Sequence, residues 1–340
     1  MILDIFNEDA FGVVDLTTSI NKLPYVPNRL DRMGIFTREG LTTPTAFIEE
    51  SHGKLSLVPT RARGNMSNVN NSETRKLRPF RVPHIPLNDS VMADDVSGIR
   101  VMGTEDQLEA ITVHVNNKMT RMKQNLEVTR EYHRIGAVKG IVLDADGTTE
   151  VYDFFDEFGV SQEVVDFDFA TPESMKKQAL AVIRLVEDAL GATPYQSIYA
   201  LCGDDFFDAF IENDEVAASF ETASDNEFAR TQQANVQGNE MNVFWWGGIG
   251  WINYRGKIGS VPFIDPEEAH FFPVGAPELF MEFNAPAPFV ETVNTIGQPF
   301  YAKQERMKWD VGVELHTQTN SLFMCTRPKC LVKATATFPA

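Results

Sequence analysis

Residues 130–148, REYHRIGAVKGIVLDADGT, join a helical pattern to a hairpin pattern and decide how the rest of the chain is interpreted. Two runs rich in residues that favour β-strands, 137–143 and 149–155, lie on either side of a polar segment at 144–148. Within that segment Asp146-Gly147 is typical of a tight turn, because glycine tolerates positive φ and aspartate accepts hydrogen bonds from its own turn. We therefore predict a β-hairpin over 137–155 that follows directly on a helix.

The helix before the hairpin has the clearest pattern in the chain. Thr104 can cap its start, Gln107 stands in the capping-box position, and Gly136 is a stop signal. Apolar residues recur between them at helical spacing: Leu108, Ile111, Val115, Met119, Met122 and Leu126. We predict a helix over 104–135 whose apolar stripe lies on a sheet. The charged residues on its other faces are expected in water: Lys118, Arg121, Lys123, Glu127 and Arg130.

IVLDADGT (141–148) also resembles the first motif of haloacid-dehalogenase-type phosphatases, where one aspartate attacks phosphorus and a second moves a proton. Lys176-Lys177 and GDDFFD (203–208) resemble that family's phosphate-binding and magnesium-binding residues. The phosphatase fold needs successive parallel strands, each reached by a crossover of about a dozen residues. Between 144 and 204 we predict only one helix and one later strand. A turn at Asp144–Asp146 and a helix capped by Asp204 and Asp205 explain the same residues, so the phosphatase stays the alternative.

Further elements follow the hairpin. Thr171-Pro172 predicts a helix start, with threonine as the N-cap, and Gly191 ends that helix. Its buried stripe is Met175, Ala179, Val182, Ile183, Val186 and Leu190. Residues 196–201 predict a strand and 204–211 a helix that carries phenylalanines into a core. The stretch 243–254 is rich in tryptophan and glycine but lacks the spacing of a dinucleotide loop, so it is interpreted as packed strands and a turn.

Composition restricts the function. The chain has 340 residues, 43% of them hydrophobic, and a net charge of -18. Such an acidic balance argues against non-specific binding of DNA or anionic membranes by the chain as a whole. The three cysteines lack C-x-x-C spacing and the six histidines are isolated, so neither a metal nor a cofactor is predicted. We expect no secretory signal, no membrane span and a reducing cytoplasm.

The basic residues concentrate in one place. Residues 46–48, 54–58 and 77–82 predict strands of a long hairpin within an extended loop at 46–96, joined by a polar segment without periodicity. In or beside that segment lie Arg61, Arg63, Arg75, Lys76, Arg78 and Arg81, opposed locally only by Glu73. These residues could bind nucleic acid, but contact with an acidic copy of the same chain is more economical. We therefore expect self-association, with these six residues as inter-subunit contacts.

The order of these elements resembles tailed-phage major capsid proteins, and local stretches are similar to the lambda-type family, the capsid E family. The stretches are KLSLVPTRARG (54–64), RPFRVPHIPLNDSVMADDV (78–96), REYHRIGAVKGIVLDADGT (130–148), PFVETVNTIGQPFYAKQE (288–305) and GVELHTQTNSLFMCTRPKCLVKAT (312–335). The resemblance implies an α+β fold of the Hong Kong 97 type. Its expected parts are an N-terminal arm (1–45), the extended loop (46–96), a peripheral domain (97–170), an axial domain (171–290) and returning C-terminal strands (291–340).

The resemblance also implies a function. Copies would form hexamers and pentamers of an icosahedral shell around packaged double-stranded DNA, without specific DNA binding. The family has no catalytic site, so no catalytic, cofactor-binding or metal-binding residue is assigned. Expected partners are the chain itself, scaffolding and portal proteins, and in some shells a decoration protein. The expected location is the virion, after assembly in the cytoplasm of a host bacterium.

Overall fold

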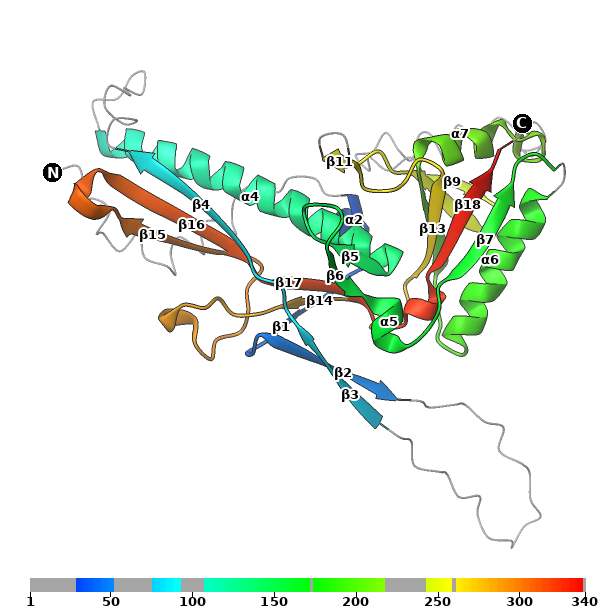
Figure 1. Cartoon of the computed structure of the whole chain (residues 1–340), viewed down its shortest axis with the longest axis horizontal. Coiled ribbons are helices and arrows are strands. Elements are labelled where there is room, and N and C mark those ends of the chain that lie inside the picture. The colour runs from blue at the N-terminus through cyan, green and yellow to red at the C-terminus, as the bar shows by residue number, and fades with distance from the viewer. Residues whose placement is uncertain are drawn as a thin grey trace, which may run out of the picture.

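The computed structural model describes residues 29–51, 75–92, 107–171, 174–217, 243–258 and 261–338. The molecule is elongated, with a long helix and a three-stranded sheet at one end and a six-stranded sheet with two helices at the other (Figure 1). A two-stranded ribbon projects from the middle (Figure 1). Helices thus pack on sheets whose strands are mainly antiparallel, and the predicted α+β class is confirmed.

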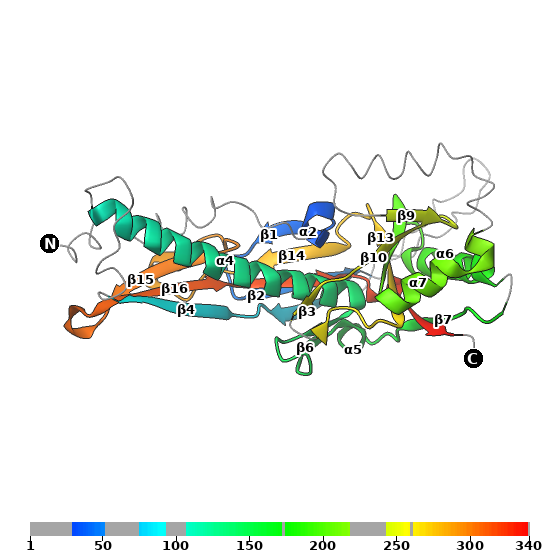
Figure 2. The ribbon, with the colours of Figure 1, turned by 90° about the horizontal axis from the view of Figure 1, so that it is seen from above.

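The long helix α4 (Gln107–Lys139) is 33 residues long. It lies along the antiparallel sheet of β15 (Tyr301–Arg306), β16 (Gly312–Thr319) and β4 (Ile85–Met92) (Figure 2). The described part of the apolar stripe predicted from spacing is buried there: Val115, Met119, Met122 and Leu126. Phe300, which directly precedes β15, and Val313 and Leu315 of β16 pack against it. Residues 104–106 and the side chains of Leu108 and Ile111 lie outside the description.

The prediction that α4 stops before Gly136 is wrong. The helix continues to Lys139 and ends at Gly140, whose φ is +89°. A Cβ atom on Gly136 would come within 2.9 Å of the carbonyl oxygen of Ile141 and the Cα of Val142. Glycine at position 136 therefore lets the following strand pack closely on α4. It does not end the helix.

The hairpin after α4 is confirmed but is shorter than predicted. It pairs β5 (Ile141–Leu143) with β6 (Glu150–Asp153) in antiparallel orientation. Residues 137–139 are helical, and β6 ends early because the Asp153 side chain accepts hydrogen bonds from the N–H groups of Phe155 and Asp156. Those bonds cap α5 (Phe154–Phe158).

A three-stranded sheet fills the middle of the molecule, in the order β1-β14-β17. β1 (Thr37–Gly40) pairs in parallel with β14 (Phe280–Asn284), and β14 pairs in antiparallel orientation with β17 (Ser321–Cys325). The short helix α2 (Arg29–Met33) precedes β1, and its Leu30 is fully buried. Residues of α2 and β1, from the predicted arm, therefore contribute to the core and to the central sheet.

The six-stranded sheet has the order β7-β18-β13-β8-β10-β9. Its strands are β7 (Glu163–Asp168), β8 (Ser197–Cys202), β9 (Val243–Trp246), β10 (Ile249–Asn253), β13 (Glu268–Val274) and β18 (Val332–Thr337). β18 comes from the far end of the chain and pairs in parallel with β7. The helices α6 (Met175–Leu190) and α7 (Asp204–Glu212) pack against this sheet, and the ring of Phe210 stacks on Trp251 at 3.9 Å.

Both of these helices begin differently from the prediction. Thr171 does not cap α6, because its N–H and hydroxyl donate to the Asp168 carboxylate and the helix starts four residues later. Asp204 and Asp205 do not cap α7 either. Gly203 is the N-cap residue, and the two aspartates lie in the first turn, where a negative charge favours the helix through its dipole.

Several short elements complete the chain. They are β11 (Lys257–Ile258) and β12 (Val261–Pro262), and the 3-10 helices η3 (Val290–Thr292), η4 (Lys308–Asp310) and η5 (Pro328–Cys330). Gly247 and Gly248 form the turn between β9 and β10, as interpreted from the sequence.

The projecting ribbon pairs β2 (Thr45–Ser51) with β3 (Arg75–Arg81) in antiparallel orientation. It is the base of the predicted long hairpin (Figure 1). Ala46 and Phe80 lie opposite each other and are buried in the core. The predicted strand at 54–58 and the polar segment lie outside the described residues.

Candidate assembly interface

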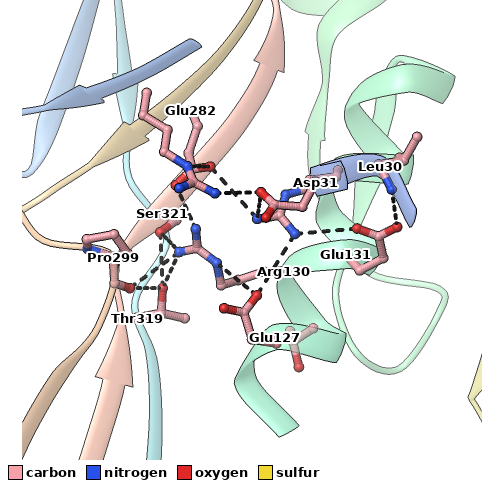
Figure 3. Close-up of polar contacts among 12 residues, drawn as sticks. Leu30, Asp31, Glu127, Arg130, Glu131, Glu282, Pro299, Thr319 and Ser321 are labelled. Atoms are coloured by element: carbon pink, nitrogen blue, oxygen red, sulfur yellow. Dashed lines mark hydrogen bonds and ion pairs between the residues drawn. The ribbon is translucent and has the colours of Figure 1, made fainter. Parts of the chain in front are cut away.

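A largely buried cluster of charged residues, with only Arg38 at the surface, joins three parts of the chain that are far apart in sequence (Figure 3). α4 contributes two arginines and two glutamates, α2 an aspartate, β1 an arginine and β14 a glutamate. They are Asp31, Arg38, Glu127, Arg130, Glu131, Arg134 and Glu282. The cluster fixes the N-terminal segment and the central sheet to the long helix.

Arg130 is at the centre of this cluster, and its side chain is only 2% exposed. Its Nη2 lies 2.6 Å from the Glu282 carboxylate, while Nη1 donates to the hydroxyls of Thr319 and Ser321 and to the carbonyl of Pro299. The guanidinium also lies over the rings of Phe300 and Phe323, at 4.9 and 5.2 Å from their centroids. Such a buried ion is tolerated because charges, hydroxyls and aromatic faces replace water around it.

Arg134, one turn further along α4, extends the cluster to the N-terminal segment. Its Nη2 lies 2.9 Å from Asp31, and its Nη1 lies 3.4 Å from Glu131. Glu131 in turn accepts a hydrogen bond from the N–H of Leu30 at 2.9 Å and one from the Tyr254 hydroxyl at 3.3 Å.

The two buried glutamates differ in pKa. Burial raises the pKa of Glu131, and the Leu30 N–H and Arg134 only partly oppose it. Burial also acts to raise the pKa of Glu282, but Arg130, Arg38 and Arg134 more than offset this effect, so its pKa lies below the ordinary value. Glu282 is therefore the anion that the arginines neutralise.

The prediction that the charged residues of α4 face water is wrong for three of them. Lys123, Glu127 and Arg130 are buried, whereas Arg121 is exposed as predicted. Lys123 lies over the ring of Phe300 at 5.4 Å, and burial lowers its pKa. One signal could have indicated the cluster: Glu127, Arg130, Glu131 and Arg134 repeat at three- and four-residue spacing, which favours ion pairs along a helix.

The six basic residues proposed as inter-subunit contacts are only partly described. Arg78 of β3 donates to the carbonyl of Glu157 and lies over the ring of Phe158 at 5.4 Å, so it helps to hold the ribbon on α5. Arg81 is exposed, and its carbonyl accepts from the Tyr152 hydroxyl at 2.7 Å. Arg75 and Lys76 belong to β3 without described side chains, and Arg61 and Arg63 lie outside the described residues.

The sequence patterns missed an apolar surface on the same ribbon. Successive residues of a strand point to opposite faces, and here one face enters the core through Ala46 and Phe80. On the other face Phe47 is 56% exposed and Leu77 is 63% exposed, with exposed Pro79 opposite Phe47. A ribbon that is apolar on both faces is typical of a surface that another protein covers.

The residues of the phosphatase alternative do not share a site. Asp144 and Asp146 lie at the turn of the separate two-stranded sheet β5-β6, where Asp146 accepts hydrogen bonds from the N–H groups of Thr148 and Thr149. Lys176 and Lys177 lie on α6, and Asp204 and Asp205 on α7 beside the six-stranded sheet. Since β5 and β8 belong to different sheets, the parallel arrangement that the phosphatase requires does not form.

The described residues hold no group of three or more His, Cys, Asp or Glu side chains that could bind a metal ion. Cys202, Cys325 and Cys330 are buried and free. In the part of the chain that the structure describes, none of the helices has the length and apolar character of a membrane span.

Similarity to known proteins shows which family this chain belongs to. The family described as "Phage major capsid protein E" matches residues 12–336, nearly the whole chain. This chain belongs to that family. Two relatives are the major capsid proteins of Pseudomonas phage KPP10 and Salmonella phage Felix O1, at 26% and 24% identity. The first alignment covers 97% of this chain and 98% of the relative, and the second covers 97% of each.

The structural likeness agrees with membership of the capsid family. The asymmetric unit of the bacteriophage PhiM1 mature capsid superposes with a TM-score of 0.52 at 11% identity, covering 93% of this chain and 90% of that chain. The fold is therefore the Hong Kong 97-type capsid fold predicted from the resemblance. The chain is a major capsid protein of a tailed phage, and it is a virion component that associates with itself. The phosphatase alternative finds no support.

Proposed function

We propose that this capsid protein assembles into hexamers and pentamers of an icosahedral shell that encloses double-stranded DNA, and that the β2–β3 ribbon is a principal contact between copies. One observation supports the role of the ribbon as a contact. The ribbon has a buried apolar face and a second, exposed apolar face with Phe47, Leu77 and Pro79. Exposed aromatic and aliphatic side chains beside arginines are typical of the energetic centre of protein interfaces.

The basic residues of the extended loop support the same role. In a chain with net charge -18, the acidic surfaces available to Arg61, Arg63, Arg75, Lys76, Arg78 and Arg81 include those of its own copies. Each exposed ion pair contributes only about 0 to 1 kcal/mol, but it recurs at every equivalent interface of a closed shell. Small contributions then add up over the assembly.

The division into domains is part of the proposal. The six-stranded sheet with α6 and α7 would form the axial domain, and α4 with the sheet β15-β16-β4 the peripheral domain. β7 and β18 lie outside the predicted range 171–290 but pair within the six-stranded sheet, so we assign them to the axial domain.

The role proposed is structural and not catalytic, in keeping with the family. The partners proposed beyond the chain itself are scaffolding and portal proteins and, in some shells, a decoration protein. Assembly would take place in the cytoplasm of the host bacterium. The acidic surface supports enclosure of DNA without specific binding, because like charges repel and an inner wall that bound DNA tightly would hinder packaging.

The test reverses charge on the extended loop. We expect Arg61→Glu combined with Arg63→Glu and Lys76→Glu to give folded, soluble protein that does not form shells. Circular dichroism measures the fold and negative-stain electron microscopy the assembly. Arg121→Glu with Lys257→Glu and Lys308→Glu makes the same charge change at exposed residues elsewhere and is the control.

The outcomes separate the explanations. Shells from the loop variant would refute the interface role, and loss of shells in both variants would show that total charge, not its position, matters. A DNA-binding assay runs beside these measurements. Wild-type binding to DNA that the loop variant loses would instead assign the basic residues to nucleic acid.

A further inference from the structure

α6 carries a basic stripe that the described part of the chain leaves unneutralised. Lys176, Lys177 and Arg184 are exposed and, among the described residues, none of their side chains makes a hydrogen bond or ion pair. Leu180 lies between them and is 41% exposed. With Glu215 these four residues line an open hollow of about 580 Å³.

The one carboxylate in the hollow is already engaged. The Glu215 side chain accepts hydrogen bonds from the backbone N–H groups of Met175 and Lys176, at 3.0 and 3.3 Å, and so satisfies the start of α6. It is bound to the backbone and pairs with none of the three cationic side chains. Three cationic side chains therefore surround an exposed leucine without a carboxylate partner among the described residues. The chain has 48 acidic and 30 basic residues, so a second copy can supply such carboxylates.

α7 carries a stripe of the opposite charge. Asp205, Asp208 and Glu212 are exposed, and among the described residues their side chains likewise make no ion pair. Ile211 lies beside them and is 39% exposed. Both stripes have one aliphatic side chain among like charges.

The two stripes also match in length. Lys176, Leu180 and Arg184 follow one another at four-residue spacing, and Asp205, Asp208 and Glu212 at three- and four-residue spacing. At about 1.5 Å of rise per residue, the basic stripe extends about 12 Å along its helix and the acidic stripe about 10 Å. α6 and α7 both belong to the six-stranded unit at one end of the molecule (Figure 1), so each copy presents both stripes there.

We propose that the basic stripe of α6 docks on the acidic stripe of α7 in a second copy of this chain, with Leu180 against Ile211. The proposal rests on the proposed shell function and names a contact within it. Because the two halves of this contact differ, it is heterologous and repeats from copy to copy, which is the kind of contact that closes rings. Opposite charges would guide the encounter, and the aliphatic pair would exclude water.

The test uses two charge reversals and their combination. One variant is Lys177→Glu with Arg184→Glu, the second is Asp208→Lys with Glu212→Lys, and the third carries all four changes. We expect each double variant to raise the protein concentration needed for assembly at least tenfold, without change in its circular dichroism spectrum. The fourfold variant should recover assembly because it restores opposite charges across every contact.

The controls keep this proposal separate from the shell function. Arg121→Glu with Lys257→Glu matches the first double variant in charge and should assemble like wild type. Wild-type protein that forms no shells would overturn the shell function itself. Wild-type shells together with normal assembly of both double variants would overturn only the α6–α7 contact. So would double variants that fail and are not recovered by the fourfold variant, since the partner of α6 is then not α7.

Discussion

The two halves of α4 are buried for different reasons. In the N-terminal half Val115, Met119 and Met122 lie on the sheet β15-β16-β4, and exposed residues such as Arg121 face water. In the C-terminal half charged residues are themselves buried: Glu127, Arg130, Glu131 and Arg134 are all at most 5% exposed. Helical amphipathicity describes the first half only.

The difference shows what each kind of contact contributes. Apolar packing in the first half is favourable in many arrangements, because the hydrophobic effect is not directional. Buried ions lose their hydration and are tolerated only where each finds its partner in good geometry. We interpret the charged half as the part that specifies how α2, β1 and β14 are placed on α4, and the apolar half as the part that mainly contributes stability.

The largest effect is expected from Arg130→Ala. This change removes the closest partner of Glu282 and leaves the hydroxyls of Thr319 and Ser321 without their donor. Breaking a buried pair typically costs about 3 to 5 kcal/mol, so we expect insoluble protein or a large fall in the urea concentration at half-unfolding. Arg121→Ala, at an exposed arginine of the same helix, should stay within about 0.5 kcal/mol of wild type. Equal stability of the two variants would show that the cluster does not hold the fold together.

A smaller effect is expected in the apolar half. Met119→Ala should cost about 3 kcal/mol through lost burial and the cavity left behind, whereas Met119→Leu should cost less than about 1.5 kcal/mol because volume is kept. Arg130→Met is the corresponding apolar replacement in the charged half, and it should cost more than Met119→Leu because Glu282 loses a partner. Chemical denaturation of the three variants measures this order. If Arg130→Met is as stable as Met119→Leu, the two halves do not differ in the way inferred.

Local patterns predicted the elements that depend on neighbouring residues. The apolar stripe of α4, the turn at Asp146-Gly147 and the end of α6 at Gly191 follow from spacing and backbone preference, and all three are confirmed. Gly136 was misinterpreted because a glycine in a helix can either end it or admit a close neighbour. Only the position of Ile141 and Val142 distinguishes the two.

The charged cluster could not be predicted in the same way. Arg130 meets Glu282 across 152 positions of sequence, and Arg134 meets Asp31 of α2. On helical spacing alone these residues belong to the polar side of α4, so the sequence predicted that Glu127 and Arg130 face water. The exposed apolar face of the ribbon was also missed, because the sequence does not show which face of a strand is buried. Only the structure shows that Ala46 and Phe80 enter the core, which leaves Phe47 and Leu77 on the exposed face.

The smallest effect concerns His133, in the charged half of α4. The pKa of His133 is lowered from 6.5 to about 4, chiefly by burial; Asp144 acts to raise it, and Arg130 acts to lower it. In the unfolded chain the ring takes up a proton near pH 6.5, but in the folded chain it does so only near pH 4. Folding stability that depends on His133 is therefore fully present above pH 6.5 and is lost as the pH falls from 6.5 to about 4. At pH 5.5 this loss amounts to about 1.4 kcal/mol. We expect His133→Gln to be less stable than wild type at pH 8 but to lose less stability on going to pH 5.5, measured by urea unfolding at both pH values.

His114→Gln, in the apolar half of the same helix, is measured beside it as the control for removing a histidine. A variant at position 133 that keeps the full wild-type pH dependence would show that His133 is not buried in its neutral form.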